Sequence, residues 1–118
     1  MRIASVSENL NIEKRIAITP EIAKKYLALG LEVFLPENYA LHLGINIEEY
    51  TSLGVKIGKD EKEIISNADI IVQLGLLNDD QNSIIKQNQT LIGVLNPYTN
   101  EEKLKDLVNK NVNVFSLE

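Results

Sequence analysis

Residues 19–35 read TPEIAKKYLALGLEVFL, and this stretch decides the fold. Thr19 can cap a helix whose first residue is Pro20, where the missing N–H has no cost, and Gly30 suits the exit of that helix. The buried face of the helix is predicted to contain Ile22, Ala23, Tyr26, Leu27 and Leu29. An apolar run, Leu31–Leu35, follows at once, so the stretch predicts a helix that leads directly into a buried strand.

Similar apolar runs recur on both sides of this stretch. Strands are predicted at Ile3–Val6, Leu31–Leu35, Val55–Ile57, Asp69–Leu74, Leu91–Leu95 and Val112–Phe115. Helix starts are predicted where a capping oxygen precedes a carboxylate by three residues, at Asn46 with Glu49, Asp60 with Glu63 and Thr99 with Glu102. A further helix is expected to open at Asp79 and Asp80, with an apolar face at Ile84 and Ile85 and Lys86 near its carboxyl end. This alternation predicts an α/β fold: an open, mainly parallel sheet with helices on both faces.

Bulk composition narrows the class of protein. The chain has 118 residues, 44% of them hydrophobic and 25% charged, which suits one globular domain spanning 1–118. It contains no cysteine and one histidine, so neither a disulfide framework nor a metal site is predicted. The net charge is −5 and the only arginines are Arg2 and Arg15, so no nucleic-acid partner is expected. The apolar runs are far too short to span a bilayer.

A complete dinucleotide-binding fingerprint is missing. Such a fingerprint needs clustered glycines between the first strand and the first helix, where backbone approaches a pyrophosphate. The corresponding segment, Ser7–Pro20, contains no glycine, and the six glycines of the chain never form the G-x-G-x-x-G pattern. The sequence therefore predicts a three-layer domain of Rossmann or flavodoxin type that does not itself hold a dinucleotide tightly.

Two residues are candidates for binding a ligand. Arg15 precedes the first predicted helix, and a guanidinium offers a rigid fork for a carboxylate. Asn96 follows the fifth predicted strand, in the segment Asn96-Pro97-Tyr98, and strand-end loops carry the sites of α/β proteins. His42 and the paired carboxylates of the helix starts fit structural roles, so no catalytic residue is predicted in this chain.

The segment Arg15-Ile16-Ala17-Ile18-Thr19-Pro20 resembles the R-[VI]-A-[LIV]-T-P element of the alanine dehydrogenase and NAD(P) transhydrogenase family. The resemblance covers essentially the whole chain, in the family's order and spacing. It includes Met1-Arg2-Ile3, Leu29-Gly30-Leu31-Glu32-Val33, Leu53-Gly54-Val55, Asn67-Ala68-Asp69-Ile70-Ile71 and Asn111-Val112. It implies the amino-terminal domain of such an enzyme.

Two departures favour the transhydrogenase branch. Alanine dehydrogenases present a lysine after the fourth strand and a histidine after the fifth, whereas this chain has Gln73 to Leu76, with Gly75, and Asn96 in those places. The resemblance thus implies the first domain of the α subunit of a proton-translocating transhydrogenase, an enzyme that transfers hydride between NADH and NADP⁺. The substrate-carboxylate role of Arg15 belongs to the alanine dehydrogenase branch.

The resemblance also implies where the remaining domains lie. The chain stops just after a predicted strand, so we expect a fragment truncated before the NAD-binding domain, with the sites for NAD(H) and NADP(H) beyond Glu118. Expected partners are the rest of the α subunit and the membrane and NADP-binding components, in a homodimer that is cytoplasmic and peripheral to the inner membrane. Two alternatives stay open: an alanine- or saccharopine-type amino-acid dehydrogenase domain, and a non-enzymatic α/β module that binds a partner or small anion through Arg15.

Overall fold

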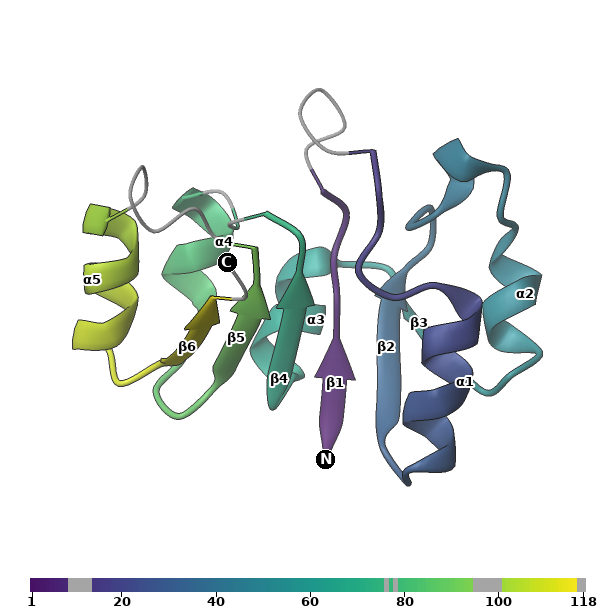
Figure 1. Ribbon diagram of the computed structural model, residues 1–118, viewed down its shortest axis with the longest axis horizontal. Helices are drawn as coiled ribbons and strands as arrows, with labels where there is room; N and C mark the ends of the chain where they lie inside the picture. The colour runs from purple at the N-terminus through teal and green to yellow at the C-terminus, as the bar shows by residue number, and fades with distance from the viewer. Residues whose placement is uncertain (9–13, 76, 78, 95–100, 117–118) are drawn as a thin grey trace.

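The computed structural model describes residues 1–8, 14–75, 77, 79–94 and 101–116, with only the backbone described at positions 79, 80 and 82. Within these ranges, apolar runs form strands and amphipathic runs form helices, as predicted (Figure 1). The strands are β1 (Arg2–Ala4), β2 (Glu32–Pro36), β3 (Lys56–Gly58), β4 (Ile70–Gln73), β5 (Thr90–Gly93) and β6 (Asn113–Ser116). They form one six-stranded sheet in the order β3-β2-β1-β4-β5-β6.

Every strand pair of this sheet is parallel. The predicted mainly parallel sheet is therefore confirmed and is, in the described part of the chain, wholly parallel. β1 lies at the centre and pairs with β2 on one side and β4 on the other. The chain first builds outward from β1 to β3, then returns to the other side and builds outward to β6, which is the doubly wound arrangement.

The helices begin where capping chemistry predicts them. They are α1 (Pro20–Ala28), α2 (Ile47–Thr51), α3 (Glu61–Asn67), α4 (Asp79–Ile84) and α5 (Glu101–Asn109), with a 3₁₀ turn, η1, at Leu41–Leu43. The Thr19 hydroxyl accepts from the Ile22 N–H at 3.3 Å, and the Asp60 carboxylate accepts from the Lys62 N–H at 3.0 Å. At α2 the Glu49 carboxylate accepts from the Asn46 N–H at 2.9 Å. The predicted cap at Thr99 lies outside the described residues.

Two hydrophobic clusters separate the layers. One packs α1 and α2 against one face of the sheet through residues that include Ile18, Ala23, Val33, Leu35 and Tyr50. The other packs the α3 and α5 side of the molecule against the opposite face through Ile65, Ile71, Leu91 and Leu107. Helices on both faces confirm the predicted three layers.

Two details of the helices differ from prediction. Leu29 does not belong to the buried face of α1: the helix ends at Ala28, Leu29 is its C-cap, and its side chain is 76% exposed because the chain turns there into Gly30 at φ +86°. α4 ends at Ile84, so Ile85 and Lys86 follow the helix instead of closing it, although Ile85 is buried.

Candidate functional site

The strand order places a topological switch point at the carboxyl ends of β1 and β4. The connections leave these two neighbouring strands toward opposite faces of the sheet, so the loops that follow them separate. In open α/β sheets this switch point is where ligands bind. The segments that meet there are residues 5–8 after β1, residues 74 and 75 after β4, and residues 14–19, which lead into α1 (Figure 1).

Gln73 lies at the end of β4. Its side chain connects β4 to the segment that follows β1, past the end of the backbone ladder between these two central strands. Its side chain is almost fully buried, with 2% of the residue exposed. The amide oxygen accepts from the Ser5 hydroxyl at 2.7 Å and from the Val6 N–H at 2.8 Å, while the amide nitrogen donates to the Val6 carbonyl at 3.2 Å. Because a backbone N–H can only donate, these contacts fix which way the amide faces.

Glu8 continues this connection to the loop after β4. Its carboxylate accepts from the Gln73 side-chain nitrogen at 2.9 Å, from the Leu74 N–H at 2.9 Å and from the Gly75 N–H at 3.0 Å. Hydrogen bonds to an ionised acceptor are stronger than neutral ones. Glu8 therefore acts as a clasp that holds the loop after β4 against the loop after β1.

Tyr39 extends the connection toward α1. Its hydroxyl accepts from the Ala17 N–H at 3.0 Å and the Ile18 N–H at 3.1 Å, and lies 2.8 Å from the Ser5 hydroxyl. Since two N–H groups occupy the acceptor positions of the phenol, its own proton points to Ser5, and Ser5 donates onward to Gln73. A directed chain of hydrogen bonds thus runs from Tyr39 through Ser5 and Gln73 to Glu8, and we call it the carboxyl-edge network.

A second tyrosine fixes the same segment from its other side. The Tyr50 hydroxyl donates to the Ile18 carbonyl at 2.8 Å, and the two tyrosine rings meet edge to face at 6.3 Å and 74°. Burial raises the pKa of Tyr39, although hydrogen bonds from Ser5, Ile18 and Ala17 counteract part of that rise. Burial likewise raises the pKa of Tyr50. Both phenols stay protonated at neutral pH and serve as fixed donors and acceptors.

The structure locates one of the two predicted ligand-binding residues. Arg15 lies on the segment whose next residues are held by Tyr39 and Tyr50, and its side chain is exposed at the carboxyl edge. Beside it, the Lys14 carbonyl lies 2.7 Å from the His42 Nε2, and the structural role of His42 stays a prediction. Asn96 lies outside the described residues, so its role in ligand binding stays a prediction.

Sequence reasoning missed the network that organises this edge. Ser5, Glu8 and Tyr39 were not predicted as site residues, and Gln73 stood out only as a member of the segment that lacks a lysine. A signal was present: Ser5 and Gln73 interrupt apolar runs of buried parallel strands, where polar residues need a partner. Which partner each one finds is a tertiary fact, since Ser5 and Gln73 stand 68 positions apart.

Other kinds of site are not found in the described part of the chain. No group of three or more His, Asp or Glu side chains there is placed to hold a metal ion, and no helix there is long and apolar enough to cross a membrane. In the carboxyl-edge network the carboxylate, the amide and the backbone N–H groups are bonded to one another, so they hold the loops in place. The exposed Arg15 lies on the segment that this network anchors.

Known proteins are similar to this chain in sequence and in fold. The family model "Alanine dehydrogenase/PNT, N-terminal domain" matches residues 5–118. The first part of the NAD(P) transhydrogenase subunit alpha of Rickettsia prowazekii is 37% identical over all of this chain, and an alanine dehydrogenase of Methanococcus maripaludis is 26% identical over all of it. The chain covers 32% of each of these two proteins, or about a third of their length.

Solved structures agree on the fold. A transhydrogenase from Sinorhizobium meliloti superposes with a TM-score of 0.90 at 23% identity, covering 98% of this chain and 34% of that one. An L-alanine dehydrogenase superposes equally well, with a TM-score of 0.90 at 17% identity, covering 98% of this chain and 32% of that one. At these identities the superpositions bear on the fold alone.

Proposed function

This chain belongs to the alanine dehydrogenase/PNT N-terminal domain family, and from that premise we propose that it is the first domain of the α subunit of a proton-translocating NAD(P) transhydrogenase. In the complete enzyme, hydride passes between NADH and NADP⁺ and is coupled to proton translocation. Residues 1–118 then form one domain of a longer polypeptide, whose partners are the rest of the α subunit and the membrane and NADP-binding components. The assembly we propose is a homodimer at the cytoplasmic side of the inner membrane.

The observation that carries this choice within the family is the whole-chain identity of 37% with the transhydrogenase α subunit of Rickettsia prowazekii. The alanine dehydrogenase of Methanococcus maripaludis reaches 26% over the same span. Both branches share the fold, so the sequence difference, and not the superposition, favours the transhydrogenase.

The loop after β4 supports the same choice. Gly75 stands in the segment where alanine dehydrogenases present a lysine, and its N–H is bonded to Glu8 at 3.0 Å. A Cβ added at Gly75 would lie 3.4 Å from the Glu8 carboxylate oxygen, at the close end of ordinary contact. Glycine leaves this loop without a cation, so the loop lacks the group that an amino-acid dehydrogenase uses on its substrate.

In this proposal the domain supports the reaction and does not carry it out. No residue of 1–118 is assigned to hydride transfer, and the sites for NAD(H) and NADP(H) belong to other domains. The role of this chain is to present Arg15 and the loop after β4 in fixed positions at the carboxyl edge. The carboxyl-edge network provides that fixation through hydrogen bonds between segments distant in sequence.

Calorimetric titration with NADH tests the placement of the cofactor site. The 118-residue chain is compared with a longer polypeptide that continues along the native reading frame. We expect heat of binding from the longer polypeptide only; tight binding by the short chain would place a cofactor site inside it and contradict the proposal. A stop codon directly after Glu118 would instead favour a free-standing module.

Activity of the full-length protein separates the two enzymatic branches. Membranes that contain it should catalyse NADH-dependent reduction of NADP⁺, or of an NADP⁺ analogue. They should show no NADH formation that depends on alanine. Alanine-dependent NADH formation would reverse the assignment in favour of the dehydrogenase.

A further inference from the structure

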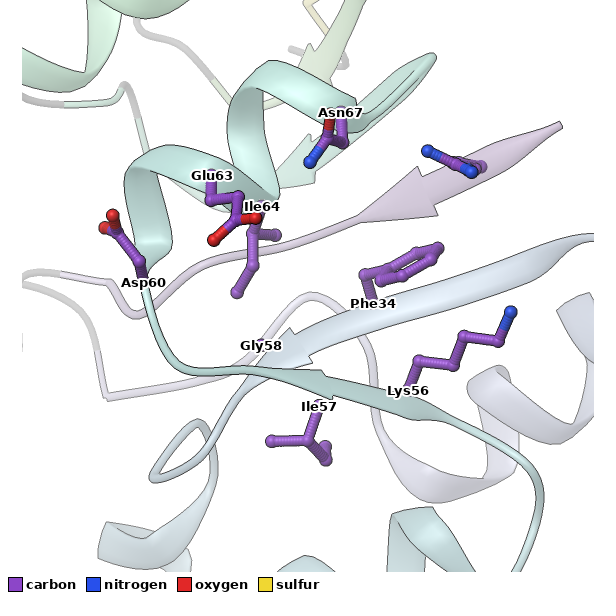
Figure 2. A pocket seen from close by; sticks show the side chains of 9 residues that line it. Phe34, Lys56, Ile57, Gly58, Asp60, Glu63, Ile64 and Asn67 are labelled. Atoms are coloured by element: carbon purple, nitrogen blue, oxygen red, sulfur yellow. The ribbon is translucent and has the colours of Figure 1, made fainter.

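A groove that does not include residues of the carboxyl-edge network lies between α3 and the edge strand β3, on the sheet face opposite α1 (Figure 2). Its volume is about 350 Å³, at the small end of the range for ligand pockets. The groove is lined by residues of the sheet, Arg2, Phe34, Lys56, Ile57 and Gly58, and of the α3 region, Asp60, Glu63, Ile64 and Asn67. This surface plays no part in the proposed function.

One end of the groove is cationic around an aromatic ring. The Arg2 guanidinium lies 5.7 Å and the Lys56 ammonium 5.5 Å from the centre of the Phe34 ring. Both cations pair with the same carboxylate, Glu32, at 3.8 Å and 3.1 Å. The hydrogen bond from Lys56 is the main reason that the pKa of Glu32 is lowered. Two cations that share one carboxylate leave this end attractive to a second anion.

The other end is acidic. Asp60 and Glu63 lie at the start of α3, and Figure 2 shows them at the end of the groove opposite Lys56. The Asp60 carboxylate uses one oxygen, Oδ1, to cap the helix at the Lys62 N–H. Two carboxylates at this end favour a ligand cation.

The floor between these ends is apolar and tightly packed. Phe34 and Ile64 lie between the charged ends in Figure 2. A Cβ at Gly58 would fall 2.6 Å from Ile64 Cγ1, so glycine is what lets the helix approach the strand this closely. In Figure 2 the apolar side chains of Phe34 and Ile64 thus separate the cationic end from the acidic end. This arrangement suits a ligand whose two opposite charges are separated by an apolar chain.

We propose that this groove binds an ω-amino carboxylate: a carboxylate held by Arg2 and Lys56, an extended alkyl chain on Phe34 and Ile64, and an ammonium held by Asp60 and Glu63. The same chemistry occurs in a free ω-amino acid and in a carboxyl-terminal lysine of a polypeptide. The alkyl spacer is what separates these ligands from ordinary α-amino acids.

The probe is 6-aminohexanoate, titrated into the ¹⁵N-labelled 118-residue chain and followed by amide chemical shifts. We expect saturable shifts in β3 and α3 and none in the loop after β4. Hexanoate and hexylamine each keep only one of the two charges. Their affinity should be lower than that of 6-aminohexanoate by at least about tenfold. Equal binding of these half-charged analogues, or no saturable shift with 6-aminohexanoate, overturns the proposal. Nα-acetyl-lysine distinguishes the sources: tighter binding than 6-aminohexanoate identifies a polypeptide carboxyl terminus, and weaker binding identifies a free small molecule.

Three single variants locate the site. Lys56→Gln and Glu63→Gln each remove one charged side chain of the groove. Each should lower the affinity for 6-aminohexanoate by about fivefold to tenfold. Lys62→Gln removes an exposed lysine of the same helix that does not line the groove, and it should leave affinity unchanged. All three change exposed side chains, and unchanged amide dispersion will show that each variant is folded. If Lys62→Gln lowers the affinity by the same factor, the ligand is attracted by the overall charge of the surface. That result would refute the proposed binding site.

Discussion

Two buried glutamines lie at opposite ends of the parallel strands, and their hydrogen bonds have different roles. Gln89 stands just before β5 at the amino edge, and its side-chain nitrogen donates to the Ile65 and Ala68 carbonyls at 2.7 Å each. These carbonyls belong to the end of α3, where helices leave acceptors unsatisfied. Gln89 thus completes one helix end, and its contacts are local to the amino edge.

Gln73 stands at the carboxyl edge, and its contacts continue outward. Through Ser5 it reaches Tyr39 and the segment that carries Arg15, and through Glu8 it reaches the loop after β4. The same side-chain chemistry therefore stabilises a fold at one edge and positions loops at the other. The comparison can be tested by removing each glutamine and asking how far the effect spreads.

The largest effect is expected for Gln73→Leu. This change keeps most of the volume but leaves the Val6 N–H and carbonyl and the Ser5 hydroxyl without their partner, at a cost of about 3 kcal/mol in the free energy of unfolding. Urea denaturation measures the cost, and hydrogen exchange should accelerate at Leu74 and Gly75. The matched control is Gln87→Leu at an exposed glutamine, which should change stability little. Unchanged hydrogen exchange at Leu74 and Gly75 would contradict the conclusion that Gln73 and Glu8 hold the loop after β4 in place.

A smaller loss, about 2 kcal/mol, is expected for Gln89→Leu, because the groups left unpaired there are chiefly carbonyls. Hydrogen exchange should change around α3 and β5 but not at Leu74 and Gly75. Since the two glutamines have no common partner, the double variant should lose the sum of the two single losses. A clear departure from additivity would mean that the two edges are coupled.

Tyr39→Phe should cost about 1.5 kcal/mol, because it leaves the Ala17 and Ile18 N–H groups without an acceptor. The readout that distinguishes positioning from general stability is local exchange at these two amides, which should rise before global unfolding does. Tyr26→Phe, which removes a hydroxyl of α1 outside the network, is the control. Equal behaviour of the two variants would argue against a special role for Tyr39.

The smallest effect concerns alkaline pH. The pKa values of Tyr39 and Tyr50 are raised in the folded state, so above the usual tyrosine value of about 10 the unfolded chain releases protons that the folded chain keeps. Stability should be constant through neutral pH and fall as pH rises beyond about 10. Urea midpoints between pH 8 and 11 measure this fall, and Tyr39→Phe should make the slope shallower. A slope unaffected by that change would assign the fall to other groups.

Much of the fold was predictable because its signals are local. Strand runs such as Asp69–Leu74 and caps such as Thr19 and Asp60 act within a few residues, and the alternation of strands and helices leaves few topologies open. The prediction that Leu29 belongs to the buried face of α1 was wrong. Apolar character alone does not show how many residues before Gly30 the helix ends. Leu29 shows that the end of a periodic pattern is its least informative region.

The candidate site was predictable by location and only partly by residue. Arg15 stood out because of its side-chain type and its place before a helix. Glu8 and Tyr39 did not, because a glutamate after a strand and a tyrosine in a loop are common, and their importance depends on pairings with residues 66 and 22 positions away. Those pairings arise when the sheet closes, and no local pattern encodes them.

The central place of β1 also bears on how the protein is made. β1 leaves the ribosome before the other strands of this sheet, and β2 follows soon afterwards to pair with one side of it. The other edge waits for β4: the Arg2 N–H meets the Asp69 side chain 67 positions later, and the Asp69 N–H donates to the Arg2 carbonyl at 2.8 Å. During synthesis, the nascent chain must therefore keep one edge of its innermost strand open until most of the domain has emerged. Of the two hydrophobic clusters, the one beneath α1 and α2 can consequently assemble first, with the network at Gln73 closing afterwards.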